Sequence, residues 1–308
     1  MTRKIGIIGD GHVGSTVAHY IVTNGFADDL VLIDKNEAKV NADAIDFREA
    51  MPNLPFHTNI TVNDYAALKD ADVIISALGN IRLNDGAKED RFSELAYNSE
   101  QVKSVAAKIR DSGFNGIIIA ITNPVDVITS LYQQVTGLPK KHVIGTGTLL
   151  DSARMKRAVA EKLNLDSRSV IGYNLGEHGN SQFTAWSTVR ALDKPLTELA
   201  KERHLDLDAL DNEARHGGYT IFKGKGYTSY GVATAAVRLA KVVLSDAHTV
   251  LPVSNYREDY DSYLSYPVVV GRDGVLDDVS LNLTDEEKEK LQNSADFIKT
   301  NFKKYSEK

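Results

Sequence analysis

The feature that most constrains this chain is a glycine-rich turn close to its N-terminus. The turn, Gly9-Asp-Gly11-His-Val-Gly14, follows the apolar run at residues 5–8 and precedes a stretch with helical spacing of apolar residues. Between a strand and a helix, Gly9 allows a tight turn, Gly11 lets a pyrophosphate approach the backbone, and Gly14 lets the helix pack closely on the strand. The helix N-terminus supplies N–H donors and the positive end of its dipole. The turn therefore predicts a dinucleotide site.

An acidic residue further along supports this prediction and indicates which dinucleotide binds. The glycine motif alone is also compatible with an ordinary turn. Asp34, however, closes the second apolar run, 20 residues after Gly14. A carboxylate at this point accepts hydrogen bonds from the adenosine ribose diol and repels a 2′-phosphate, so we expect NAD rather than NADP.

Strand and helix patterns alternate through the first half of the chain. Six short apolar runs, rich in β-branched residues, are typical of buried parallel strands. They lie at residues 5–9, 30–34, 59–62, 72–77, 116–121 and 142–145. Stretches with helical periodicity lie between most of them, for example at 13–24 and 99–112, each followed by a glycine. This alternation predicts an α/β fold with a Rossmann-type, doubly wound parallel sheet.

The pattern changes after about residue 145. We expect a helix over residues 149–163, strand-like segments to about residue 192, and further helices over 230–246 and 284–302. The chain is therefore predicted to contain an NAD-binding Rossmann domain at 1–145 and an α+β catalytic domain at 146–308. No linker rich in Pro, Gly or Ser separates the halves, so a ligand cleft between them is expected.

Composition excludes several classes of function. Lys and Arg number 36 against 42 Asp and Glu, a formal net charge of −6, so the chain is not a generally basic nucleic-acid binder. It contains no cysteine, which removes disulfides, thiolate catalysis and cysteine-ligated metal sites. The strongly apolar runs are far shorter than the roughly 18 residues that span a membrane. We expect a soluble, cytoplasmic protein without metal, membrane or nucleic-acid partners.

Five motifs, in a fixed order along the chain, carry a resemblance to a known family. They are residues 5–14, Thr122-Asn-Pro-Val-Asp126, residues 144–154, Leu175-Gly-Glu-His-Gly179 and Lys225-Gly-Tyr-Thr-Ser229. Over nearly its whole length the chain resembles the L-lactate/malate dehydrogenase superfamily. Through residues 172–182 and 224–234 it is most similar to the L-2-hydroxyisocaproate dehydrogenases of lactic acid bacteria. The resemblance implies a homotetrameric, NAD-dependent enzyme that reduces aliphatic 2-oxo acids to L-2-hydroxy acids.

Two residues are expected to handle the proton. Oxidation of a 2-hydroxy acid needs a base for the hydroxyl proton, and imidazole titrates in the suitable range. The chain has eight His residues, most of them open to ordinary structural roles. The Gly-Glu-His-Gly setting selects His178 as the acid/base. The resemblance makes Asp151 the carboxylate that orients His178 and stabilises its cation, although Asp151 could also cap a helix.

Two arginines are expected to contact the substrate. Arg154 lies three residues after Asp151 on the same helical face, and its guanidinium could hold the substrate carboxylate through two parallel hydrogen bonds. The alternative for Arg154 is a surface ion pair. Arg91 ends a polar segment, residues 79–91, that family members use as a lid. Its role by resemblance is to polarise the substrate carbonyl once the lid closes, although a solvated charged loop is also possible.

Further site residues follow from the resemblance. Asn123 comes directly after the apolar run at 116–121, at the strand end where open α/β sheets bind ligands. It is expected to hydrogen-bond the substrate and to lie near the nicotinamide ribose, although an Asn-Pro turn is the simpler alternative. Thr228 matches the substrate-pocket threonine of lactate dehydrogenases and favours them over malate enzymes. Val13 and Gly79 are expected to pack on the cofactor.

Two points concern selectivity and regulation. The lid is a few residues longer than is usual in lactate dehydrogenases, so the position that selects the substrate falls on either Arg82 or Leu83. An apolar residue there would favour aliphatic side chains, and an arginine a dicarboxylate. Enzymes activated by fructose 1,6-bisphosphate carry an arginine and a histidine where this chain has Lys156 and Ile171. We therefore expect no such activation.

Several alternatives remain at this stage. The nearest is an L-lactate or malate dehydrogenase, and a more remote one is an NAD-binding protein without enzymatic activity. The NAD- and metal-dependent glycosidases of the same ancestry use a Cys–His pair, which this chain lacks. In the D-specific 2-hydroxy acid dehydrogenases the dinucleotide motif lies in the middle of the chain, whereas here it starts at residue 9.

Overall fold

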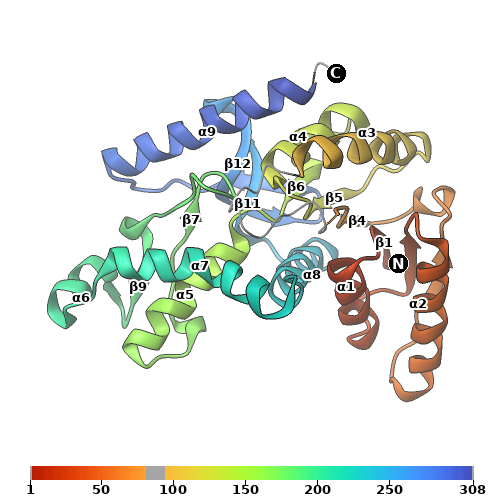
Figure 1. Cartoon of the computed structure of the whole chain (residues 1–308), viewed down its shortest axis with the longest axis horizontal. Helices are drawn as coiled ribbons and strands as arrows, with labels where there is room; N and C mark the ends of the chain where they lie inside the picture. The colour runs from red at the N-terminus through yellow and green to blue at the C-terminus, as the bar shows by residue number, and fades with distance from the viewer. Residues whose placement is uncertain (1, 81–93, 307–308) are drawn as a thin grey trace.

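The computed structural model describes residues 2–80 and 94–306, and a nine-stranded sheet forms the centre of this part of the chain (Figure 1). Its strand order is β13-β12-β11-β6-β5-β4-β1-β2-β3. The strands are β1 (Lys4–Ile8), β2 (Asp29–Ile33), β3 (Asn59–Val62), β4 (Val73–Ser76), β5 (Ile117–Ala120), β6 (Val143–Gly145), β11 (Thr249–Arg257), β12 (Ser262–Gly271) and β13 (Gly274–Asp278). Pairing from β3 through β6 is parallel. All six strands predicted in the first half, and the Rossmann-type order, are therefore confirmed.

The sheet continues beyond the predicted parallel strands. Ser254 of β11 pairs with Gly145 of β6 in antiparallel orientation, and β12 and β13 extend the same edge. These three strands were not predicted. Pro252 and Pro267 face each other across the β11–β12 pair, and a proline inside an apolar run argues against a strand when only the sequence is considered.

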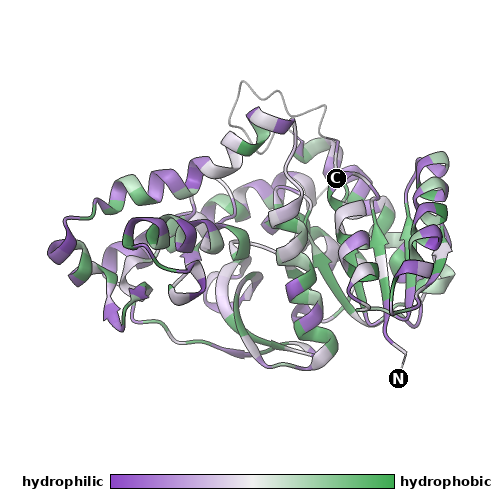
Figure 2. Ribbon diagram, turned by 90° about the horizontal axis from the view of Figure 1, so that it is seen from below, coloured by the Kyte–Doolittle hydropathy of each residue, from purple (hydrophilic) through white to green (hydrophobic). Residues whose placement is uncertain are grey.

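Helices cover both faces of the sheet. They are α1 (His12–Thr23), α2 (Glu37–Ala50), α3 (Leu95–Asp111), α4 (Val125–Thr136), α5 (Leu149–Leu163), α6 (Leu196–Arg203), α7 (Leu207–Lys225), α8 (Tyr230–Ser245) and α9 (Asp285–Ser306). One core packs α1, α2 and α8 against the sheet, and a second packs α3, α4 and α9 against the opposite face. Figure 2 shows hydrophobic residues concentrated on the strands and hydrophilic ones on the outer helices.

The second half of the chain adds to the Rossmann sheet and also forms a separate core. Helix α8 packs beside α1 on one face of the sheet. A third apolar cluster, built by α5, α6 and α7, lies away from the sheet. Two short ribbons complete this part, β7 (Asn174–Leu175) with β8 (Phe183–Thr184) and β9 (Arg190–Ala191) with β10 (Lys194–Pro195). Within the described residues, none of the helices is both long and apolar enough to cross a membrane.

Candidate active site

A cavity of about 620 Å³ lies where the two halves of the chain meet. The first half contributes the turn after β1 and the ends of β4 and β5, and the second half contributes α5, α7 and the loop between β7 and β8. The predicted site residues on its wall are Gly11, Val13, Gly79, Asn123, Arg154, His178 and Thr228. The cleft expected from the sequence therefore gathers most of the predicted site residues.

The glycine turn has the geometry that a pyrophosphate needs. Gly9 has φ +93°, and a Cβ at this position would lie 2.7 Å from the carbonyl oxygen of Ala77. A Cβ on Gly14 would lie 1.8 Å from the carbonyl oxygen of Gly9, so only glycine permits α1 to start this close to the strand. At Gly11 a Cβ would meet nothing within 4 Å, because this residue faces the cavity. The turn fits a dinucleotide, since open space adjoins the free N–H groups at a helix start.

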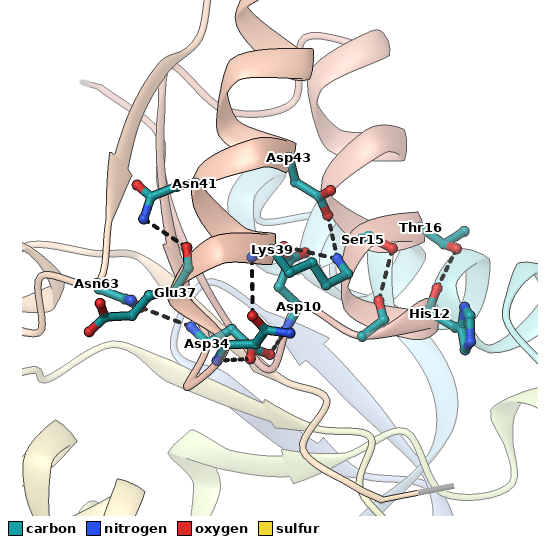
Figure 3. Close-up of polar contacts among 12 residues, drawn as sticks. Asp10, His12, Ser15, Thr16, Asp34, Glu37, Lys39, Asn41, Asp43 and Asn63 are labelled. Carbon is teal, nitrogen blue, oxygen red and sulfur yellow. Dashed lines mark hydrogen bonds and ion pairs between the residues drawn. The ribbon is translucent and has the colours of Figure 1, made fainter.

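Asp34 lies at the end of β2 and is fixed beside this turn (Figure 3). Its Oδ2 accepts a hydrogen bond from the backbone N–H of Asp10 at 2.7 Å, and its Oδ1 accepts one from Asn36 at 2.8 Å. The side chain remains partly exposed. Both oxygens keep a free lone pair, so the carboxylate can still accept hydrogen bonds from a ribose diol.

Asp151 joins the predicted acid/base to the predicted anchor. Its Oδ2 lies 2.5 Å from Nδ1 of His178, and its Oδ1 accepts a hydrogen bond from Arg154 at 2.9 Å. The Asp151 side chain is only 3% exposed, against 13% for His178 and 12% for Arg154. Thr148 occupies the N-cap position of α5, and Asp151 lies in the first turn. A buried carboxylate thus fixes one ring nitrogen of His178 and one edge of the Arg154 guanidinium.

A second buried carboxylate, not assigned by the sequence analysis, holds the backbone of the histidine. Oδ2 of Asp126 accepts a hydrogen bond from the N–H of His178 at 2.8 Å. Asp126 is 1% exposed, and burial raises its pKa to about 7. It belongs to the Thr-Asn-Pro-Val-Asp motif, but nothing in the spacing links it to a histidine 52 residues away.

The loop that carries His178 is braced from two sides. Glu177 is buried, and its Oε2 accepts hydrogen bonds from the N–H and hydroxyl of Ser181 at 2.8 and 2.7 Å. Arg215 of α7 pairs with Asp211 at 2.6 Å and donates to the carbonyl oxygen of Gln182. Arg215 also lines the cavity and was not identified from the sequence.

Of the remaining predicted residues, Asn123 and Thr228 lie at the cavity and Arg91 is not described by the structure. Asn123 lies on the cavity wall, and its backbone carbonyl accepts a hydrogen bond from Asn98 at 2.8 Å. Thr228 is on the wall beside Tyr227. Arg91, together with Arg82 and Leu83, lies outside the described residues. No group of three or more His, Asp or Glu side chains within residues 2–80 and 94–306 is arranged to hold a metal ion.

The fold and the site define a class of protein. A Rossmann sheet with an NAD-type glycine turn meets a histidine–aspartate pair and an arginine in one cavity, as in nicotinamide-dependent dehydrogenases. Residues 3–145 match the family model of the lactate/malate dehydrogenase NAD-binding domain, and residues 148–308 match that of the lactate/malate dehydrogenase α/β C-terminal domain. The chain belongs to the lactate/malate dehydrogenase family.

Similar proteins agree with this assignment. L-lactate dehydrogenase 3 of Bacillus anthracis is 36% identical over 307 residues, which cover 97% of this chain and 96% of that protein. The crystal structure of the minor L-lactate dehydrogenase from Enterococcus mundtii has a TM-score of 0.92 at 33% identity, with 98% of each chain covered. A lactate dehydrogenase from a deep-sea metagenome of the Medee basin has a TM-score of 0.91 at 32% identity, covering 99% of this chain and 100% of that one. The protein is an NAD-dependent 2-hydroxy acid oxidoreductase that acts on CH–OH donors.

Proposed function

We propose that the protein reduces aliphatic 2-oxo acids with NADH and prefers side chains larger than the methyl group of pyruvate, as in L-2-hydroxyisocaproate dehydrogenases. The observation that carries the proposal is the network in which Asp151 holds both His178 and Arg154 at the cavity wall. A proton carrier and a carboxylate anchor, fixed by one buried carboxylate, are the two groups that a 2-oxo acid requires.

The chain's own residues would divide the work as follows. NADH, when bound, supplies the hydride that adds to the 2-oxo carbon. Arg154 holds the substrate carboxylate, and protonated His178 donates its proton to the carbonyl oxygen, which completes the hydroxyl group. Asp151 orients the imidazole and stabilises its cation. Arg91 polarises the carbonyl, and Asn123 hydrogen-bonds the substrate.

The cofactor would be held by the first half of the chain. In this proposal the pyrophosphate lies against Gly9, Gly11 and Gly14 at the start of α1, and the adenosine ribose lies at Asp34. Support comes from the open space at Gly11 and from the free lone pairs of the Asp34 carboxylate. Val13 and Gly79, both on the cavity wall, pack on the cofactor.

The residues around Arg154 favour a substrate with a single carboxylate. Gly217 and Gly218 lie in the middle of α7 next to Arg154, and Gly218 forms part of the cavity wall. The absence of a side chain at Gly218 makes room for the Arg154 guanidinium, because a Cβ there would lie 2.8 Å from its Nη2. Among the described residues, Arg215 also faces the cavity, but its guanidinium is bound to Asp211 and to backbone carbonyls. This supports a monocarboxylate with an apolar side chain over a dicarboxylate such as oxaloacetate.

A panel of substrates tests the proposal. We expect kcat/KM with NADH to be highest for 2-oxoisocaproate among pyruvate, oxaloacetate, 2-oxoisocaproate and phenylpyruvate. The second candidate is L-lactate dehydrogenase activity, which the names of the relatives favour. A preference for pyruvate of about tenfold or more would establish that candidate, and a preference for oxaloacetate would contradict both.

The resemblance also extends to assembly, domains and location. We propose a homotetramer, because Ile45 on α2 and Phe56 in the segment before β3 are apolar side chains that remain 55% and 45% exposed in the single chain. Light scattering coupled to size exclusion should give the mass of four chains.

We further propose a domain division at residues 145–146, where β6 ends. We also propose a cytoplasmic location, which suits a chain without cysteine.

A further inference from the structure

A charged cluster next to Asp34 takes no part in the reaction described above (Figure 3). Asp10 lies between the first two glycines of the turn, and its side chain is fully buried. Its backbone N–H donates to Asp34, and its Oδ2 lies 3.3 Å from Nζ of Lys39. The same ammonium also pairs with Asp43, one turn further along α2. Two carboxylates therefore hold one lysine immediately beside the predicted ribose site.

The position of Lys39 makes this pairing significant. Helix α2 begins three residues after Asp34, and Lys39 lies in its first turn, where its N–H is capped by Asn36. A lysine ammonium is a compact cation on a flexible stem and can bind a phosphate. By its place in the chain, Lys39 is therefore a natural partner for a phosphate on the ribose 2′-oxygen.

The second lysine near Asp34 is also engaged. Nζ of Lys35 lies 2.6 Å from the hydroxyl of Tyr97 on α3 and 5.3 Å from the centre of its ring. Lys35 and Lys39 both follow Asp34 in the sequence, and both ammonium groups contact partners within the chain. Within the described part of the chain, the two lysines that follow Asp34 are therefore directed to other partners.

The ion pair between Lys39 and Asp10 is costly to break because Asp10 is buried. Burial and the neighbouring Asp43 raise the pKa of Asp10 to about 7, and Lys39 opposes this rise. If Lys39 turned towards a phosphate, an ionised Asp10 would be left buried without a cation, which is strongly unfavourable. Asp43 is partly exposed and adds a second attraction to the same ammonium.

We propose that Asp10 and Asp43 form a second determinant of selection for NAD over NADP, because they hold the Lys39 ammonium away from a 2′-phosphate. The proposal rests on the proposed placement of the adenosine ribose at Asp34. Asp34 repels the phosphate directly, whereas Asp10 and Asp43 withhold a compensating cation.

Binding measurements on the free protein test this proposal without a turnover assay. The dissociation constants of NADH and NADPH are measured by fluorescence at about pH 8, above the pKa of Asp10. In the Asp10→Asn/Asp43→Asn double variant we expect the dissociation constant of NADPH, divided by that of NADH, to fall by about fivefold. Adding Lys39→Met should restore the wild-type ratio. A matched control is Asp46→Asn, which removes one exposed carboxylate from the same helix and should leave the ratio unchanged.

Each outcome distinguishes the possibilities. An unchanged ratio in the folded double variant, or a fall that persists after Lys39→Met, overturns the proposal. If the double variant does not fold, the single variant Asp43→Asn replaces it. In this variant the ratio should fall by less, and Lys39→Met should again restore it. No fall in the ratio would then overturn the proposal. Asp34→Ser tests separately whether the adenosine ribose lies at Asp34. Unchanged affinities for NADH and NADPH in this variant would overturn the ribose placement. If the NADPH-to-NADH ratio falls in Asp34→Ser but not in the Asp10 and Asp43 variants, only the role of Asp10 and Asp43 is overturned.

Discussion

The substitution Gly218→Ala should damage substrate anchoring while leaving the fold intact. A Cβ at this position would lie 2.8 Å from Nη2 and 3.2 Å from Cζ of Arg154. Ordinary contact begins near 3.4 Å, so the guanidinium must move by about 0.6 Å. Arg154 currently donates to Asp151 at 2.9 Å and is 12% exposed. Because the displaced atoms are the tip of a flexible side chain, we expect the cost to fall on the proposed anchor and not on folding.

The magnitude follows from the hydrogen bonds at stake. A hydrogen bond to a charged group contributes about 1.5–3 kcal/mol, and partial loss of about 1.4 kcal/mol corresponds to a tenfold change in binding. We therefore expect KM for 2-oxoisocaproate to rise about tenfold in Gly218→Ala, with the dissociation constant of NADH unchanged. Steady-state kinetics with saturating NADH and a fluorescence titration of NADH provide these two values.

Gly217→Ala is the matched control. It makes the same substitution one residue earlier in α7 and gains the same helix propensity, about 1 kcal/mol, but its Cβ would lie 4.0 Å from Cδ of Arg154. KM should stay near the wild-type value in this variant. Equal KM values in the two variants, or a rise in Gly217→Ala alone, would refute the idea that space beside Arg154 is reserved for its guanidinium.

Two further predictions concern charged groups at the site. Arg154→Lys should raise KM for the 2-oxo acid about tenfold or more, because an ammonium cannot make two parallel hydrogen bonds to a carboxylate; an unchanged KM would exclude Arg154 as the anchor. Asp126 has a pKa raised by burial to about 7, so between about pH 4 and pH 7 the folded protein keeps a proton that the unfolded chain has lost. Its contribution to stability therefore decreases as pH rises through this window, by at most about 4 kcal/mol. Asp126→Asn, which keeps an acceptor for the His178 N–H, should show a smaller decrease in the free energy of unfolding between pH 5 and pH 8, and equal pH dependence in both proteins would contradict the prediction.

Local patterns were sufficient to predict the Rossmann part of the fold. Most of the parallel strands are short apolar runs buried on both faces, such as β4 and β5, and such runs are recognisable without tertiary information. Helices with a weak apolar pattern were not predicted. In α2, only Val40, Ala44 and Phe47 are buried over 14 residues. Helix α7 contains three glycines, which disfavour a helix when its packing is unknown.

The candidate site was predictable where a motif carried it and not where tertiary contacts define it. Asp151 and Arg154 lie three residues apart on one helix, so their shared face follows from helical geometry. The bond from His178 to Asp126 and the clamp that Arg215 places on the same loop depend on how distant segments meet. Their importance comes from burial and pairing, which no local spacing encodes.

The most direct test of the proposed mechanism is the variant His178→Asn, studied for binding and turnover in the same preparation. If His178 donates the proton to the substrate oxygen, its loss removes general acid catalysis, which contributes about two to four orders of magnitude. We expect kcat for 2-oxo acid reduction to fall by about three orders of magnitude, while the dissociation constant of NADH stays within about twofold of the wild-type value. Turnover close to that of the wild type would show that another group carries the proton.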